Sequence, residues 1–276
     1  MSPSSSHAAV RRYALGAIVL HWTIAVLIVL QVVLSGRMDG RTPEAFAVTQ
    51  LHKSVGITVL LLSLARLGWR LAHPPPPESA SLSAWERRLA KGVHWSFYVV
   101  MLGMPLTGWI MVSASRIAVP TLLYGVIPWP NVPGLEGLPA ATKHAWHEVA
   151  EQSHGIIIKF GYALLALHVA GALKHQLSSR AEPILPRMAP GARTGRWAEP
   201  WLLAILVGFG AVVAFGRTVQ PPLPATAPPP ERAAAEAASA PEPAATVTPA
   251  PTPTPALPVA TAAAAPPNPP KAPPPA

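Results

Sequence analysis

The sequence predicts an all-α integral membrane protein: a four-helix transmembrane bundle, a fifth transmembrane helix and a disordered tail rich in Pro and Ala. Half of the 276 residues are hydrophobic and only 12% are charged, and the mean hydropathy is positive, which is typical of membrane proteins. Several apolar segments approach the roughly 20 residues that a helix needs to cross a bilayer. We place them at about 15–35, 49–68, 94–114, 154–173 and 200–216.

The signals between these segments set the expected boundaries. The first segment is too long for the core of a signal peptide and lacks a small-residue cleavage pattern after it, so we expect a retained helix. A run of four prolines, 74–77, ends the second helix, and the amphipathic stretch 85–88 that follows predicts an interfacial loop. The fifth segment is the shortest. We therefore expect a bundle domain at 1–190, a fifth helix at 198–217 and a tail at 218–276.

Pro and Ala dominate the tail, with scattered Thr and Glu. Such a composition cannot bury a hydrophobic core, so residues 218–276 are predicted to form a semi-extended, disordered arm. Two interpretations stay open for it. The arm is either a tether toward a soluble redox partner or the cell wall, or a low-complexity segment without a selected role.

The basic residues predict the orientation in the membrane. One set of loops and flanks carries Arg11, Arg12, Arg66, Arg70, Arg87, Arg88, Lys91, Lys174, Arg180, Arg187, Arg193 and Arg196. The opposite loops carry only Arg37, Arg41, Arg116 and Lys143. By the positive-inside rule, the amino terminus lies in the cytoplasm and the tail in the periplasm of a bacterial inner membrane. Because these charges fall in short loops rather than in one stripe, they do not indicate nucleic-acid binding.

The chain contains no cysteine, which excludes several kinds of site. Disulfides, iron–sulfur clusters, thiolate zinc sites and covalent haem attachment all need cysteine. A haem in this protein would be held without covalent bonds to the macrocycle.

Histidines inside the apolar segments carry the main functional signal. His154 and His168 lie fourteen residues apart in one segment, which returns the side chain to within about 40° of the same helix face and separates the pair by roughly 21 Å. In the predicted topology His21 shares the cytoplasmic depth of His168, and His52 shares the outer depth of His154. Ionisable side chains in a bilayer usually mark ion paths, proton relays or cofactors.

This matching by depth predicts two haem b groups with iron bound by two histidines each, His21 with His168 and His52 with His154. Iron with two axial histidines has no open position, so such haems carry electrons. A packed, hydrogen-bonded histidine is the plainer interpretation of any one of these residues. His147 is an alternative to His154, but its 21-residue separation from His168 implies roughly 31 Å, the whole hydrocarbon thickness.

Other polar residues near the predicted helices receive secondary roles. We expect His94 and His175 to lie at the membrane interface, and His144 and His147 in the outer loop, as proton carriers or adventitious metal ligands. Basic side chains near the helix ends either pair with haem propionates or extend to the headgroups; they are Lys53, Arg66, Arg70 and Lys174.

Several short motifs, taken together, resemble the bacterial cytochrome b561 family over about residues 11–190. They are Arg12-Tyr13, Leu20-His21-Trp22, Leu51-His52-Lys53-Ser54-Val55-Gly56, Leu64-Ala65-Arg66-Leu67, Pro105-Leu106-Thr107-Gly108-Trp109, Leu167-His168-Val169-Ala170, Ala172-Leu173-Lys174-His175 and Leu185-Pro186-Arg187-Met188. The resemblance implies a four-helix bundle, two b-type haems on His21, His52, His154 and His168, and electron exchange with the quinone pool. The segment 200–216 and the tail lie outside it.

The expected function is therefore electron transfer between the membrane quinone and a donor or acceptor at the outer face, superoxide:quinone oxidoreduction included. Whether the chain is an enzyme or a respiratory-chain electron carrier stays open, as does a soluble periplasmic redox partner. The alternative function is the haem-bearing membrane anchor of a larger dehydrogenase or hydrogenase. A haem-free transporter with histidine proton relays would leave the matching by depth unexplained.

Overall fold

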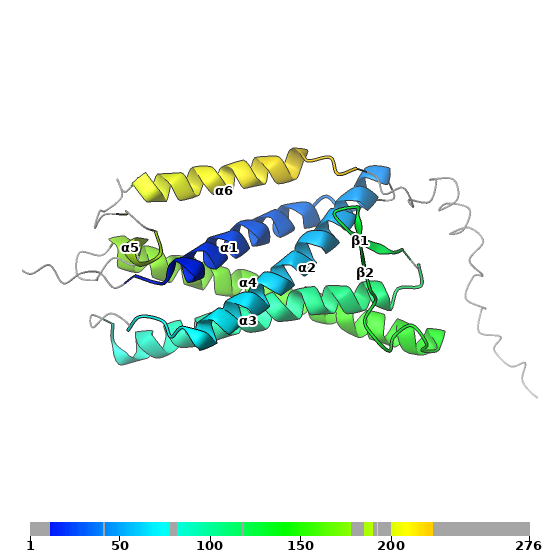
Figure 1. Cartoon of the computed structure of the whole chain (residues 1–276), viewed down its shortest axis with the longest axis horizontal. Coiled ribbons are helices and arrows are strands. Elements are labelled where there is room, and N and C mark those ends of the chain that lie inside the picture. The colour runs from blue at the N-terminus through cyan, green and yellow to red at the C-terminus, as the bar shows by residue number, and fades with distance from the viewer. Residues whose placement is uncertain are drawn as a thin grey trace, which may run out of the picture. The chain divides into compact units, whose positions relative to one another are not determined.

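A computed structural model describes residues 12–40, 42–77, 82–117, 119–177, 185–189, 192 and 200–222. Within these residues, five helices are long and apolar enough to cross a membrane. They are α1 (Leu15–Ser35), α2 (Pro43–Ala72), α3 (Ala84–Ser113), α4 (Ala140–Leu177) and α6 (Pro200–Thr218), with a single turn, α5 (Leu185–Met188), before the last. The predicted all-α membrane architecture is confirmed (Figure 1).

Local sequence explains where the helices begin and end. At the start of α2, Thr42 accepts a hydrogen bond from the Ala45 amide, and Pro43 occupies the first turn, where its missing N–H costs nothing. Helix α3 begins with a capping box in which Ser83 and Glu86 satisfy each other's backbone amides. Helix α2 ends immediately before the proline run, because a residue that precedes proline disfavours the helical conformation.

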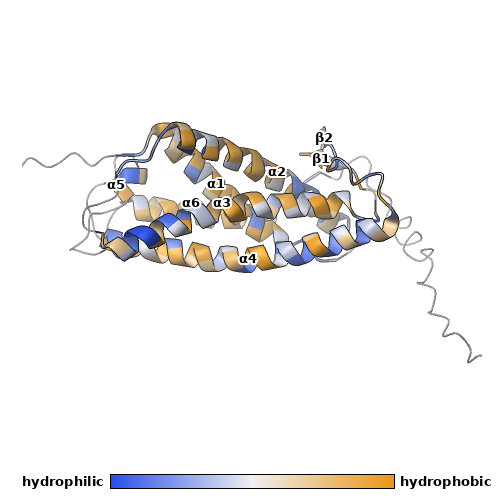
Figure 2. Cartoon of the chain, turned by 90° about the horizontal axis from the view of Figure 1, so that it is seen from below, coloured by the Kyte–Doolittle hydropathy of each residue, from blue (hydrophilic) through white to orange (hydrophobic). Residues whose placement is uncertain are grey.

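Helices α1 to α4 each pack against the next helix along the chain, and α6 returns to pack against α1. Helix α1 contacts both α2 and α6, α2 contacts α3, and α3 contacts α4 along most of its length. One apolar cluster joins α1 and α2 through Leu30, Leu34, Val48, Val55 and Val59. Large apolar residues are also exposed on the outside of the helices, for example Ile156, Phe160 and Val169 of α4, and Figure 2 shows many apolar residues along α4 and its neighbours. Such surfaces are suited to lipid rather than water.

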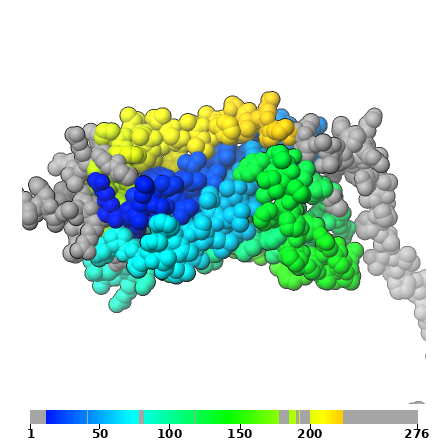
Figure 3. Space-filling view, in the orientation of Figure 1, coloured from blue at the N-terminus to red at the C-terminus, as the bar shows by residue number. Residues whose placement is uncertain are grey.

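A short hairpin lies between α3 and α4, a feature that the sequence analysis does not predict. Strand β1 (Thr121–Leu123) pairs antiparallel with β2 (Ile127–Trp129). The turn places Tyr124 and Gly125 at φ values of 52° and 77°. Glycine tolerates this region, whereas tyrosine rarely adopts it. In Figure 3 the hairpin segment, in green, lies beside the carboxyl end of α6.

Two expected boundaries are wrong. Residues 85–88 belong to the first turns of α3 rather than to an interfacial loop, because the capping box starts the helix at Ala84. Helix α4 starts at Ala140, so His144 and His147 are helical rather than part of an outer loop. The predicted tail lies outside the described residues from position 223 onward.

Candidate functional site

The first group of histidines gathers toward the end of the bundle where α4 finishes. His21 of α1 and His168 of α4 have ring centroids 6.3 Å apart. The two predicted partners from different helices therefore lie close together.

His94 of α3 belongs to the same group, although the sequence analysis gives it an interfacial role. Its ring centroid lies 5.5 Å from that of His168, and Phe97, one turn further along α3, lies 5.2 Å from His168. The Nδ1 of His94 is 2.7 Å from the Ala90 carbonyl, so Nδ1 must be the donor and Nε2 keeps its lone pair. The capping box at Ser83 was the sequence signal that could have started the third helix at Ala84, ten residues before His94, rather than at His94 itself.

Arg66 of α2 controls the tautomer of His21. Its Nη1 lies 3.1 Å from His21 Nδ1, and because a guanidinium only donates, Nδ1 accepts and Nε2 carries the proton. Binding of a metal by His21 Nε2 would require the proton to move to Nδ1 and Arg66 to turn away. Arg70, one turn along, stacks its guanidinium over the Trp95 ring at 5.7 Å.

The second group lies at the other end of the bundle. His52 of α2 and His154 of α4 are near enough to interact electrostatically. Among the described residues, the buried Nδ1 of His52 has no hydrogen-bond partner. A Cβ added to Gly108 of α3 would make an ordinary van der Waals contact with His154 Cε1, at 3.5 Å, so α3 packs directly against this imidazole.

Thr107 of α3 sets the tautomer of His154. The Thr107 hydroxyl donates to the backbone carbonyls of Gly103 and Met104, at 2.9 and 2.8 Å, and its oxygen lies 2.9 Å from His154 Nδ1. Because its single proton is already used, the hydroxyl accepts from Nδ1–H. With the proton on Nδ1, the lone pair of His154 lies on Nε2, which is the state that a metal ligand needs.

His144 and His147, near the start of α4, have different surroundings. The Nδ1 of His147 donates to the Met111 carbonyl at 2.9 Å, and its Nε2 lies 3.9 Å from Glu151. His144 lies 3.7 Å from Glu148 in the same i,i+4 arrangement. Among the described residues there is no group of three or more His, Asp or Glu side chains that could hold a metal ion.

The basic side chains at the helix ends also differ in their contacts. Lys174 makes an ion pair with Glu86 at 2.7 Å and lies over the Trp85 ring, so it joins the ends of α3 and α4. Arg66, by contrast, is directed at His21 within the first group of histidines.

The residues present fit a non-covalently bound haem. Imidazoles meet at two ends of one bundle, the buried His52 Nδ1 has no partner among the described residues, and a glycine lies against His154. Unpaired imidazole nitrogens in an apolar interior are costly without a ligand. These features match the donor set that b-type haem iron uses.

Comparisons with known proteins identify the family. The family described as prokaryotic cytochrome b561 matches residues 12–191. "Cytochrome b561 homolog 2" of Escherichia coli (strain K12) is 25% identical over 179 residues, which are 63% of this chain and 89% of that protein. "Probable superoxide oxidase CybB" of Yersinia pestis is 26% identical over 188 residues, 66% of this chain and 98% of that protein. The chain therefore belongs to the prokaryotic cytochrome b561 family of bacterial membrane proteins, which implies a b-type haem and a role in electron transfer.

Proposed function

We propose that this chain is a di-haem cytochrome that transfers electrons between the membrane quinone pool and a donor or acceptor at the outer face of the inner membrane. The observation that best supports this proposal is that a single helix, α4, supplies one histidine to each of the two groups. His154 lies within electrostatic reach of His52, and the ring of His168 lies 6.3 Å from that of His21. The fourteen residues between His154 and His168 span roughly 21 Å of helix, so two redox centres would lie at two depths.

When bound, haem supplies reversible one-electron chemistry, and the residues of the chain set its position and surroundings. His21, His52, His154 and His168 would be the axial ligands. Thr107 holds His154 in the tautomer that can bind iron. Arg66, if released from His21, could pair with a propionate carboxylate of the haem.

The outer electron donor is proposed from the relatives. One relative is named a probable superoxide oxidase. Superoxide would give up one electron and leave as dioxygen, and two such electrons with two protons convert one quinone into quinol. Superoxide is therefore the first donor to test at the face that holds His52 and His154.

The test is a reduced-minus-oxidised spectrum with a haem-to-protein ratio on the detergent-purified full chain. Two low-spin b-type haems per chain, reduced by superoxide and reoxidised by quinone, would support the proposal. One haem per chain would refute one of the histidine pairs, and no haem would refute the function. Stable co-purification with a soluble catalytic subunit would favour the membrane-anchor function instead.

A further inference from the structure

The two outer histidines differ in what their Nδ1 atoms contact. His154 Nδ1 donates to the Thr107 hydroxyl at 2.9 Å, whereas the buried Nδ1 of His52 has no hydrogen-bond partner among the described residues. A histidine that binds a metal through Nε2 carries its proton on Nδ1 and almost always donates that proton to an acceptor. As a haem ligand, His52 therefore needs an acceptor close to its Nδ1.

Gln31 of α1 offers the complementary atom. Its side-chain Oε1 is buried and also lacks a hydrogen-bond partner in the part of the chain that the structure describes. A carboxamide oxygen only accepts, which is what an Nδ1–H group requires. Buried polar atoms without partners are uncommon, and each calls for an explanation. One hydrogen bond between His52 and Gln31 would satisfy both atoms.

Gln31 lies beside the part of α2 that carries His52. Its Nε2 is 3.2 Å from the place that a Cβ on Gly56 would take. Gly56 follows His52 by one turn on the same face of α2, where such positions are about 5–6 Å apart. The backbone carbonyl of Gln31 is also near enough to act on the His52 ring. Backbone and amide of Gln31 thus both adjoin the helix face from which His52 projects.

The backbone carbonyl of Gln31 is the competing acceptor. Within α1 it already accepts from the amide four residues further along, and it forms no hydrogen bond with His52 Nδ1. The side-chain oxygen has no other donor. The terminal torsion of a glutamine side chain is broad, so the amide can turn its oxygen toward His52 without any movement of α1.

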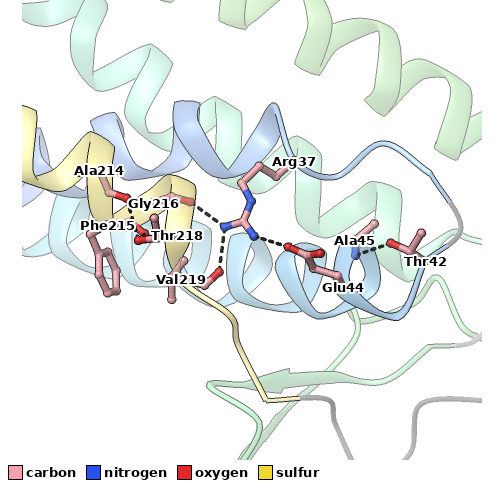
Figure 4. A network of polar contacts seen from close by, with 9 residues as sticks. All are labelled: Arg37, Thr42, Glu44, Ala45, Ala214, Phe215, Gly216, Thr218 and Val219. Carbon is pink, nitrogen blue, oxygen red and sulfur yellow. Dashed lines mark hydrogen bonds and ion pairs between the residues drawn. The ribbon is translucent and has the colours of Figure 1, made fainter.

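The contact between α1 and α2 is held in register on both sides of Gln31. Leu30, its neighbour in α1, belongs to the apolar cluster that α1 shares with α2. Just beyond the end of α1, Arg37 makes an ion pair with Glu44 in the first turn of α2 at 2.6 Å (Figure 4). Since the two helices are joined at both points, Gln31 stays next to His52.

We propose that Gln31 is a positioning residue of the outer haem: its Oε1 accepts a hydrogen bond from His52 Nδ1–H and holds the imidazole in the tautomer that binds iron through Nε2. This hydrogen bond makes the imidazole a stronger electron donor, which stabilises oxidised iron and lowers the reduction potential. Gln31 thus does for His52 what Thr107 does for His154. The inference rests on the proposed function for a haem at this pair, and it adds a residue that tunes its potential.

The experiment is a spectroelectrochemical titration of the haem-loaded full chain, with the haem content of each variant measured first. Gln31→Met keeps the length of the side chain but removes the acceptor. The equilibrium constant for reduction of one haem should therefore rise about threefold to tenfold, equivalent to about 30–60 mV. Gln31→Glu keeps an acceptor oxygen, so its potential should lie at or below that of the wild type. The haem that moves should be the one lost in His154→Ala.

Gln50→Met is the matched control. Gln50 is also a buried glutamine at the outer end of the bundle, but its Nε2 donates to the Pro120 carbonyl at 3.3 Å. Both haem potentials should therefore stay at the wild-type values. Loss of the outer haem from Gln31→Met, with haem retained in Gln31→Glu and Gln50→Met, would also support the inference, because partners of metal ligands contribute about tenfold to 100-fold in affinity.

Other results would overturn the inference. A wild-type or lower potential in Gln31→Met would leave the backbone carbonyl as the acceptor for His52. Equal shifts in Gln31→Met and Gln31→Glu, or in Gln31→Met and Gln50→Met, would show a general effect of packing. A failure of the proposed function or of its ligands looks different: the wild type would hold no haem, or His154→Ala would keep both.

Discussion

At the scale of single residues, hydrogen-bond direction decides which histidine nitrogen is available. Thr107 and His94 illustrate this, because each contact leaves one possible arrangement of protons. Thr107 accepts from His154, and His94 donates to the Ala90 carbonyl. The sequence shows that these residues are present, but their protonation follows only from the neighbouring carbonyls.

Thr107→Val should raise the reduction potential of the outer haem by about 20–60 mV, the electrical equivalent of one ordinary hydrogen bond. Valine keeps the shape but cannot accept from His154 Nδ1–H, so the imidazole becomes a weaker electron donor to iron. Spectroelectrochemical titration measures the change. Thr107→Ser should restore the wild-type potential, and an unaltered potential in the valine variant would contradict the assigned tautomer.

Loss of a ligand should remove one haem and leave the other. His168→Ala removes the histidine that lies next to both His21 and His94, so we expect about half the haem per chain by pyridine haemochrome assay. His147→Ala is the control and should keep the full haem content, because the 21-residue separation of His147 from His168 implies roughly 31 Å, the whole hydrocarbon thickness. Loss of haem from the control, together with retention in His154→Ala, would make His147 the outer ligand.

At the scale of elements, α6 is an integral part of the bundle. It packs against α1, where Gly216 approaches so closely that an added Cβ would lie 2.9 Å from Val33 Cγ1. The carboxyl end of α6 is also bound by Arg37. The close contact of Gly216 with Val33 and the hydrogen bonds from Arg37 both lie at the carboxyl end of α6. Together they hold the end of this helix against α1.

Arg37→Leu should loosen this attachment. A hydrogen bond from a charged donor contributes about 1.5–3 kcal/mol. Because Arg37 lies near the protein surface, water replaces part of the two bonds that the substitution removes, and the exposed pair with Glu44 adds little. We expect faster hydrogen exchange at the end of α6 and a local loss of about 1–3 kcal/mol. Arg116→Leu, at an exposed residue of an outer loop, should leave exchange in α6 unchanged. Equal exchange in both variants would show that Arg37 does not hold α6.

At the scale of the whole molecule, the distribution of charge predicts how the chain lies in the membrane. The loops assigned to the cytoplasm hold most of the Lys and Arg. The His52–His154 group and the hairpin would then face the periplasm, where an outer donor or acceptor can reach them.

Single cysteines test this orientation cleanly, because the chain has none of its own. Gly137→Cys, in the loop before α4, should react with a membrane-impermeant maleimide in spheroplasts. Ala84→Cys, at the start of α3, should react only after the membrane is opened. Both residues are exposed, so access to each depends on the side of the membrane. The reverse pattern would invert the predicted topology.

The sequence alone determined the class of fold, the five spans and the family, because hydropathy and short motifs are local properties of the chain. It also picked out His21 and His168 as partners, since helical rise and topology match residues by depth. Contacts between distant segments were decided only by the tertiary structure. The place of His94 beside His168, the hydrogen bond from His154 to Thr107, and the attachment of the end of α6 to Arg37 all depend on how the helices are rotated and packed against one another. Hydrophobic periodicity identifies the buried face of a helix in a water-soluble protein. In a bundle surrounded by lipid nearly every helix face is apolar, so the sequence pattern does not show which face contacts another helix; close packing of the side chains determines it.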